Sequence, residues 1–353
     1  MDEFVLGGTT IPAGARMSID LPVGNITSHS PVILPVTVVR GKKAGPCLLV
    51  TGCLHGDELN GAEIVRRLLR TPSLKRLRGT LLAVPVLNLP AFLTRTRYLP
   101  DRRDLNRCFP GASSGSLGAR LAKVVSTELL PACDAVIDLH TGAVNRPNLP
   151  QIRLSPADRE SMRLAKAFGA PVIVVASVRE GSFRGACVDA GKPVVLFESG
   201  EAARLEAGTI RFGLRGIMAV MRRLQMLAVR KGQKIEKPPP VICRKSSWER
   251  ASSFGLFTPL VPLGRAVSCG DLLGFVADPL CDEEIPLHAS REGIVIGRTN
   301  EGLIDEGDAL FHIAEASDAT EAEEQIAESG EALPSIDDGD DDHPVHHDPL
   351  TDI

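Results

Sequence analysis

The sequence predicts an α/β fold, in which a mostly parallel or mixed central sheet is flanked by helices and followed by a small all-β module. Three observations support this prediction: near-continuous apolar runs recur through the middle of the 353-residue chain, helix-like stretches separate them, and a Lys/Pro-rich segment precedes short strands with turn signals. Apolar runs of this kind are typical of strands buried on both faces of a sheet. Their alternation with helices is typical of a layered α/β domain.

The predicted elements follow in a regular order, beginning with an N-terminal β segment at 1–45 that leads into the sheet. The apolar runs predict strands at 47–53, 79–88, 134–140, 171–177 and 192–200. Helices are predicted between and after them, at 59–70, 116–130, 156–168 and 202–227. Ligands of such sheets bind at the carboxyl ends of the strands, so a site is expected in the loops after 53, 88, 140 and 198.

The predicted α/β domain spans residues 46–230 and is followed by a linker at 231–249, because KGQKIEKPPP interrupts the alternation. Residues 250–314 are expected to form the β module. This segment resembles the small barrels of biotinyl and lipoyl carrier domains, but it lacks a Lys at the modified hairpin, so a structural or substrate-capping role is expected. The tail at 315–353 contains 14 acidic residues and no Lys or Arg, with few large apolar residues, which predicts disorder.

Composition narrows the class of protein. No window approaches the ~18 apolar residues of a membrane-spanning helix, which argues against an integral membrane protein, and the N-terminus lacks a signal-peptide layout. The eight scattered Cys include no CxxC pair, so we expect reduced thiols in a cytoplasmic protein. A single Trp and a single Tyr argue against a stacking platform for nucleic acid. Residues 1–314 hold 30 acidic and 40 basic residues, which suits an anionic substrate, a nucleic-acid partner or simply a solvated surface.

The strongest chemical signal is TGCLHGDELNG at 51–61, where His55 and Glu58 follow a predicted strand and begin a helix. A spacing of three residues places both side chains on one side of a helical turn. Imidazole and carboxylate groups are good Zn²⁺ ligands, but a catalytic site needs about three protein ligands. His140, which ends the strand of DAVIDLH, is the candidate third ligand. On its own, an HxxE pattern more often marks the start of a helix at the protein surface than a metal site.

Two further segments carry candidate functional side chains. The Arg-rich loop at 95–111 ends in Asn106 and Arg107, whose amide and guanidinium groups could bind a substrate carboxylate. The alternative is a charged loop whose Arg residues pack against its own Asp101 and Asp104. Glu198 ends an apolar strand, where a partly desolvated carboxylate could act as a general base, or it could simply reach solvent.

In combination, these segments resemble the succinylglutamate desuccinylase/aspartoacylase family of the zinc carboxypeptidase-like fold group. The resemblance spans about residues 30–225 and depends on HGDE at 55–58, DLNR at 104–107, DLHTG at 138–142 and FESG at 197–200. It implies one zinc ion per chain, with His55, Glu58 and His140 as its ligands. It also implies that Glu198 activates the attacking water and then protonates the leaving amine.

The resemblance assigns roles in the Arg-rich loop as well. Asn106 and Arg107 match the family's clamp for the substrate carboxylate. The family also uses an Arg to polarise the scissile carbonyl, and Arg97, Arg102 and Arg103 all compete for this role; the adjacent Tyr favours Arg97. The family's substrate-binding Tyr in the C-terminal domain has no match, because the only tyrosine is Tyr98.

The predicted function is zinc-dependent hydrolysis of the amide bond in a small N-acylated amino acid or related carboxylate. A metallocarboxypeptidase that acts on short peptides or glutamate-type tails is the alternative within enzymes. A non-catalytic binding protein of the same fold is the alternative from another class. We expect no nucleic-acid or membrane partner, and a homo-oligomer is compatible with the sequence.

Overall fold

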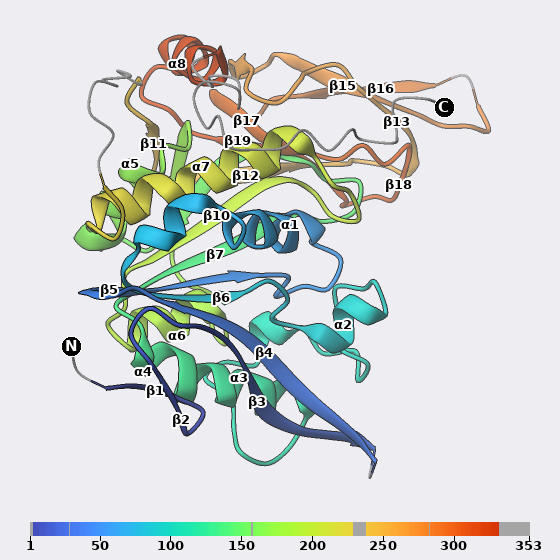
Figure 1. The fold of residues 1–353 in the computed structure, drawn as a ribbon. Coiled ribbons are helices and arrows are strands. Elements are labelled where there is room, and N and C mark those ends of the chain that lie inside the picture. The colour runs from blue at the N-terminus through green and yellow to red at the C-terminus, as the bar shows by residue number, and fades with distance from the viewer. Residues whose placement is uncertain (1–2, 28, 157, 229–237, 282, 332–353) are drawn as a thin grey trace, which may run out of the picture.

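The structure is a computed structural model that describes residues 3–27, 29–156, 158–228, 238–281 and 283–331. Thirteen strands of these residues form one mixed sheet, which confirms the predicted fold class (Figure 1). Its centre is a group of four parallel strands whose residues are almost all buried. In spatial order they are β6 (Arg78–Val84), β5 (Lys43–Gly52), β7 (Ala135–Gly142) and β10 (Val194–Glu201).

Antiparallel strands extend the parallel group on both sides. Beyond β6 lie β4 (Ser30–Arg40) and β3 (Arg16–Thr27), and a separate hairpin is formed by β1 (Phe4–Leu6) and β2 (Thr9–Ile11). On the other side, β8 (Asn148–Leu154) runs antiparallel to β10. The short strand β9 (Val172–Val175) pairs in parallel with β8 and with β11 (Val241–Cys243). Because β8 runs in the opposite direction to its neighbour β10, the first residue of β8 lies at the carboxyl end of β10.

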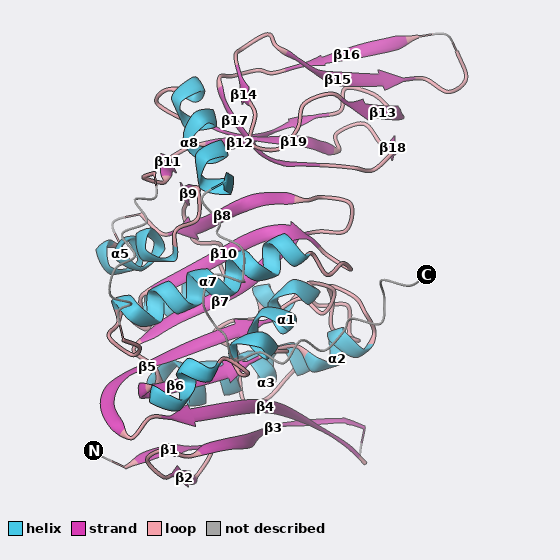
Figure 2. Cartoon of the chain, turned by 45° about the horizontal axis from the view of Figure 1, so that its top comes forward, coloured by secondary structure: helices cyan, strands magenta, loops and turns pink. Residues whose placement is uncertain are grey.

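Helices cover both faces of the sheet, as the alternating sequence pattern predicts (Figure 2). One hydrophobic core lies under α1 (Leu59–Leu68), α5 (Arg159–Phe168) and α7 (Ala207–Arg223). A second core lies under α3 (Leu117–Val124) and α6 (Phe183–Asp189). The helix predicted at 116–130 is divided, because a π-helical turn at Val125–Leu129 separates α3 from α4 (Leu130–Ala132). The remaining short helical segments are Pro72–Arg76, α2 (Leu89–Leu93) and Leu105–Arg107.

The C-terminal strands build a second sheet and also extend the first. The second sheet has the order β16 (Glu284–His288), β15 (Leu272–Ala277), β13 (Gly255–Pro259) and β18 (Leu303–Ile304). The large sheet continues from β8 through β17 (Gly293–Arg298) and β19 (Ala309–Ala314) to β12 (Ser246–Arg250), and β14 (Ala266–Val267) pairs with β17. The backbone of Gly297 pairs with that of Asn148, so the C-terminal strands join the α/β sheet directly.

Two expectations about the C-terminal third differ from the structure. The segment 231–249, expected as a linker, contains β11 and the start of β12 in its described part. The predicted disorder of the tail is wrong for α8 (Ala319–Glu331), while residues 332–353 lie outside the described chain. The helix forms because Ala319, Ala322 and Ile326 lie on one face and join a buried cluster. Among the described residues, no helix is long and apolar enough to cross a bilayer.

Candidate metal centre and active site

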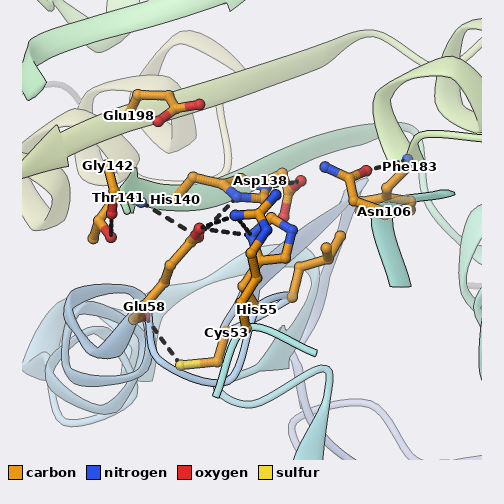
Figure 3. A network of polar contacts seen from close by, with 12 residues as sticks. Cys53, His55, Glu58, Asn106, Asp138, His140, Thr141, Gly142, Phe183 and Glu198 are labelled. Carbon is orange, nitrogen blue, oxygen red and sulfur yellow. Dashed lines mark hydrogen bonds and ion pairs between the residues drawn. The ribbon is translucent and has the colours of Figure 1, made fainter. Parts of the chain in front are cut away.

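The candidate residues meet where the parallel strands end. His55 and Glu58 lie in the turn between β5 and α1, while His140 and Glu198 lie near the carboxyl ends of β7 and β10. The backbone of Glu198 is directly opposite that of His140 in the parallel ladder. The sequence pattern predicts a site at this edge because the ends of parallel strands meet there. The three candidate metal ligands do lie together, and Glu198 lies on the neighbouring strand (Figure 3).

The turn that carries the HGDE motif is held by its backbone surroundings. Cys53 adopts a left-handed conformation with φ 47°, and its thiol donates to the carbonyl of Glu58 at 3.1 Å. Gly56 passes so close to α2 that a Cβ there would lie 2.1 Å from the backbone of Ala91. Glu58 occupies the N-cap position of α1 but makes no side-chain capping bond. Its carboxylate is therefore directed toward the histidines.

His55, Glu58 and His140 form a compact buried cluster. The Nδ1 atom of His55 lies 2.6 Å from Glu58 Oε1, and the Nδ1 atom of His140 lies 2.9 Å from Glu58 Oε2. One potential ligand atom from each of the three residues lies within 4.8 Å of the others. Two imidazole nitrogens and a carboxylate oxygen from buried residues are a donor set that suits Zn²⁺. The residues present therefore fit the metal that the sequence predicts.

A carboxylate lies next to the Nε2 atom of each imidazole of the cluster. The Nε2 atom of His140 lies 2.8 Å from Asp138 Oδ2, and the other oxygen of Asp138 accepts a 2.7 Å hydrogen bond from Thr51. The Nε2 atom of His55 lies 3.2 Å from Asp104 Oδ1. Such carboxylates fix the orientation of metal-binding histidines and leave the opposite ring nitrogen for the ion. These roles of Asp138 and Asp104 were not predicted from the sequence.

The charges of the cluster are strongly coupled. Burial alone would raise the pKa of Glu58, but the neighbouring imidazoles of His55 and His140 outweigh burial and lower it. Burial would likewise lower the pKa of His140, yet the carboxylates of Asp138 and Glu58 raise it well above its usual value. The carboxylates of Glu58 and Asp138 thus strongly favour positive charge at the position of the two imidazoles. A divalent cation supplies such a charge.

Of the three competing arginines, Arg97 is placed at the cluster. Its guanidinium Nη1 lies 3.6 Å from Glu58 Oε1 and 3.3 Å from His55 Nδ1, and its Nη2 pairs with Asp104 at 3.1 Å. Arg102 is exposed, and Arg103 pairs with Asp101 at the surface. Of the three, Arg97 is therefore the arginine that lies beside the candidate metal ligands.

Asn106 connects the Arg-rich loop to two other parts of the site. Its backbone N–H donates to Asp104 at 2.8 Å, and its side-chain oxygen accepts from the backbone N–H of Phe183 at 2.9 Å. The amide nitrogen of Asn106 points away from Phe183 (Figure 3). Arg107 is exposed, and its guanidinium donates to the carbonyl of Asn106 at 2.5 Å. The predicted pair is thus adjacent, with one rigid member and one at the surface.

Glu198 is held by side chains of β8, which the sequence argument did not identify. The amide Nδ2 of Asn148 donates to Glu198 Oε2 at 2.9 Å, and Arg153 Nε lies 3.5 Å from Glu198 Oε1. The Glu198 side chain is 16% exposed, so it is partly open to solvent. These partners could be found only from the order and direction of the strands, because they come from β8, which pairs antiparallel with β10.

Comparisons with known proteins show what the whole chain is similar to. A family model for the succinylglutamate desuccinylase/aspartoacylase catalytic domain matches residues 44–224. The N-alpha-acetyl-L-2,4-diaminobutyric acid deacetylase of Halomonas elongata is 29% identical over 312 residues, which cover 84% of this chain and 90% of the relative. A solved succinylglutamate desuccinylase/aspartoacylase from Rhodobacter sphaeroides is 27% identical, with a TM-score of 0.77 and coverage of 86% and 96% of the two chains. The product-bound ectoine utilization protein EutE (DoeB) from Ruegeria pomeroyi is 28% identical, with a TM-score of 0.77 and coverage of 86% and 97%.

Proposed function

The chain belongs to the succinylglutamate desuccinylase/aspartoacylase family, and on that premise we propose that it is a zinc-dependent amidohydrolase. In this proposal it removes the acyl group from a small N-acylated amino acid or related carboxylate. The observation that supports it most directly is the buried cluster of His55, Glu58 and His140, with a carboxylate behind each imidazole. A decayed site in a binding protein would be expected to lose part of such a costly buried arrangement.

One zinc ion would be held by Nδ1 of His55, the carboxylate of Glu58 and Nδ1 of His140. When bound there, zinc supplies a Lewis acid for the amide carbonyl and lowers the pKa of a water molecule. Asp138 and Asp104 keep the Nε2–H groups of the two imidazoles occupied, so that each ring presents Nδ1 inward. The arrangement explains why two further acids lie beside a cluster that already contains Glu58.

Glu198 is the proposed proton carrier. Its carboxylate takes a proton from the attacking water and returns it to the leaving amine as the carbon–nitrogen bond breaks. The guanidinium of Arg97 lies beside Glu58 and His55, where its charge can stabilise the negative charge that develops on the carbonyl oxygen. These two side chains act from different elements, so the scissile bond is expected to lie between β10 and the Arg-rich loop.

Asn106 and Arg107 are the proposed clamp for the substrate carboxylate. The hydrogen bond from the backbone of Phe183 fixes the side-chain oxygen of Asn106 and so directs its N–H₂ group outward. Arg107 is free to move from the carbonyl of Asn106 to an incoming carboxylate, for which its planar donor groups are well matched. Binding of the carboxylate would set the distance between the scissile amide and Glu198.

N-acetylated diamino acids are the first substrates to test, because the Halomonas elongata relative is named as a deacetylase of such a compound. The assay compares N-acetyl, N-succinyl and N-formyl amino acids with short peptides, and zinc content is measured by plasma emission. We expect near one zinc per chain and release of free amine from one acyl class. Glu198→Gln should retain the zinc and lose activity by about 10²- to 10⁴-fold.

Two results would contradict this function, and a third would change its mechanism. Release of C-terminal residues from peptides, with no deacylation, would make the protein a metallocarboxypeptidase. Zinc-loaded protein that binds these compounds without cleaving them would be a binding protein. Undiminished turnover by Glu198→Gln would remove Glu198 from the mechanism.

A further inference from the structure

Asn148 lies between the C-terminal β module and the strand that carries Glu198. This residue begins β8, and its backbone lies between Gly200 of β10 and Gly297 of β17. It is buried, with 9% of its surface exposed. Asn148 therefore stands at the point where the C-terminal strands meet the strand that carries Glu198.

The chemistry of the two groups fixes the orientation of the Asn148 amide. A carboxylate only accepts hydrogen bonds, so the NH₂ group of Asn148 must face Glu198, where the distance is 2.9 Å. The amide oxygen then faces β17. At that position Gly297 has no side chain, and a Cβ built there would lie 2.8 Å from Asn148 Oδ1. The φ angle of Gly297 is not in the left-handed region, so the close approach of Asn148 is the constraint that favours glycine here.

Other contacts keep β17 in register with β8. The side chain of Gln151 donates to the carbonyl of Ile296 at 3.1 Å, and the backbone N–H of Arg298 donates to the carbonyl of Pro147 at 3.3 Å. These bonds lie on both sides of Gly297. The position of Gly297 relative to Asn148 is consequently set by the ladder and does not depend on a mobile loop.

We propose that Asn148 is a positioning residue for Glu198, and that Gly297 of the C-terminal module keeps it in place. The inference rests on the proposed function of Glu198. A glutamate side chain has three rotatable bonds, and general-base catalysis requires one of its oxygens at a defined distance from the water. Arg153 supplies charge on the other oxygen at 3.5 Å, whereas Asn148 supplies the short directed bond. The module is thereby part of the catalytic apparatus.

The test is a double-mutant cycle on the substrate that the wild-type enzyme cleaves. Asn148→Ala should lower kcat by roughly 10- to 100-fold with KM and zinc content little changed. Gly297→Ala should also lower kcat, because its methyl group displaces the amide. In the double variant, Gly297→Ala should cost nothing further, since the Oδ1 atom that it meets is gone. Gly302→Ala is the matched control, because a Cβ at Gly302 meets nothing within 4 Å.

Asn148→Asp adds a variant of the same shape that cannot donate to an ionised Glu198, and it should lose at least as much kcat as the alanine variant. Thermal melting and zinc content identify any variant that fails to fold. If Asn148→Ala fails to fold, the test uses Asn148→Asp and the comparison of Gly297→Ala with Gly302→Ala. Wild-type kcat in Asn148→Ala, or independent multiplying effects in the cycle, would overturn the inference. Absence of deacylation by the zinc-loaded wild type would instead overturn the proposed function, so the two failures are distinguishable. Full activity of Glu198→Gln would remove only the premise that Glu198 carries the proton.

Discussion

Two buried histidines, His140 in β7 and His312 in β19, have opposite electrostatic surroundings. His140 lies between Asp138 and Glu58, whose carboxylates outweigh burial and raise the pKa of His140 well above its usual value. His312 is as deeply buried, but burial together with the guanidinium group of Arg153 lowers its pKa to about 3. Burial alone therefore does not indicate a metal ligand. The identity of the nearest charged groups separates a ligand from a core residue.

The contacts of the two rings agree with this difference. His312 stacks on Trp248 with the ring centroids 4.7 Å apart, and its Nε2 lies 3.0 Å from the hydroxyl of Ser246. Its Nδ1 has no hydrogen-bond partner in the described structure. In His140 both ring nitrogens lie within 3 Å of a carboxylate. A neutral aromatic ring suffices in the first environment, whereas the second requires a cation or a proton.

The largest expected effect separates the two histidines by zinc content. His140→Ala should lose the bound zinc and all measurable deacylase activity, because two protein ligands are too few for a catalytic zinc site. His312→Phe should keep both, since a phenyl ring can preserve the stack on Trp248. Plasma emission on the purified variants measures the first property and release of free amine the second. Retention of zinc by His140→Ala would break the comparison.

The next effect concerns the carboxylates behind the imidazoles. Asp138→Asn preserves shape but removes the negative charge next to His140, and it should lower zinc affinity by about 10- to 100-fold. Asp104→Asn should act in the same direction through His55. Competition with a chelator of known affinity gives the ratio. Asp134→Asn is the control, because Asp134 accepts a bond from the backbone of Cys47 and touches no candidate ligand. Unchanged affinity in both site variants would leave these acids without the proposed role.

Much of this site could be predicted from sequence, because ligands at strand ends and at helical spacing are encoded locally. His55, Glu58 and His140 were predicted in this way. The role of Asp138 was within reach as well, since residues two apart in a strand share a face and Asp138 precedes His140 by two. The contact of Asn148 with Glu198 could not be predicted, because it depends on which strand lies next to β10 in the sheet and in which direction that strand runs.

The fold shows the same division between local and long-range information. Buried strands and amphipathic helices of the α/β part were predicted from hydrophobic periodicity. Helix α8 was missed because the composition of the whole acidic tail concealed a short apolar stripe formed by Ala319, Ala322 and Ile326. Glu323 of that helix also accepts a bond from the backbone N–H of Ala266, a contact that no local pattern encodes.

A smaller effect is expected in the pH dependence of stability. The pKa of His312 is about 3 in the folded chain and about 6.5 when unfolded, so unfolding takes up a proton below pH 6.5. The stability that the neutral ring contributes is present above pH 6.5 and is lost as the pH falls toward 3. Between pH 6.5 and 5 the loss is about 2 kcal/mol.

Urea unfolding of the wild type and His312→Phe at pH 7 and pH 5 measures this difference, because contributions from the other groups cancel in the comparison. We expect the wild type to lose about 2 kcal/mol more than the variant. Equal losses in the two proteins would show that His312 is protonated in the folded state, and the contrast with His140 would disappear.

The smallest expected effect comes from matched removal of one hydroxyl group at each histidine. Thr51 donates to Asp138 behind His140, and Ser246 contacts His312. Ser246→Ala should lower the free energy of unfolding by about 1 kcal/mol and leave zinc affinity unchanged. Thr51→Val should cost a similar amount of stability and also weaken zinc binding severalfold, because Asp138 loses the bond that orients it. If Ser246→Ala weakened zinc binding as much as Thr51→Val does, the two histidines would belong to one coupled network. The nearest charged groups would then not separate a metal ligand from a core residue.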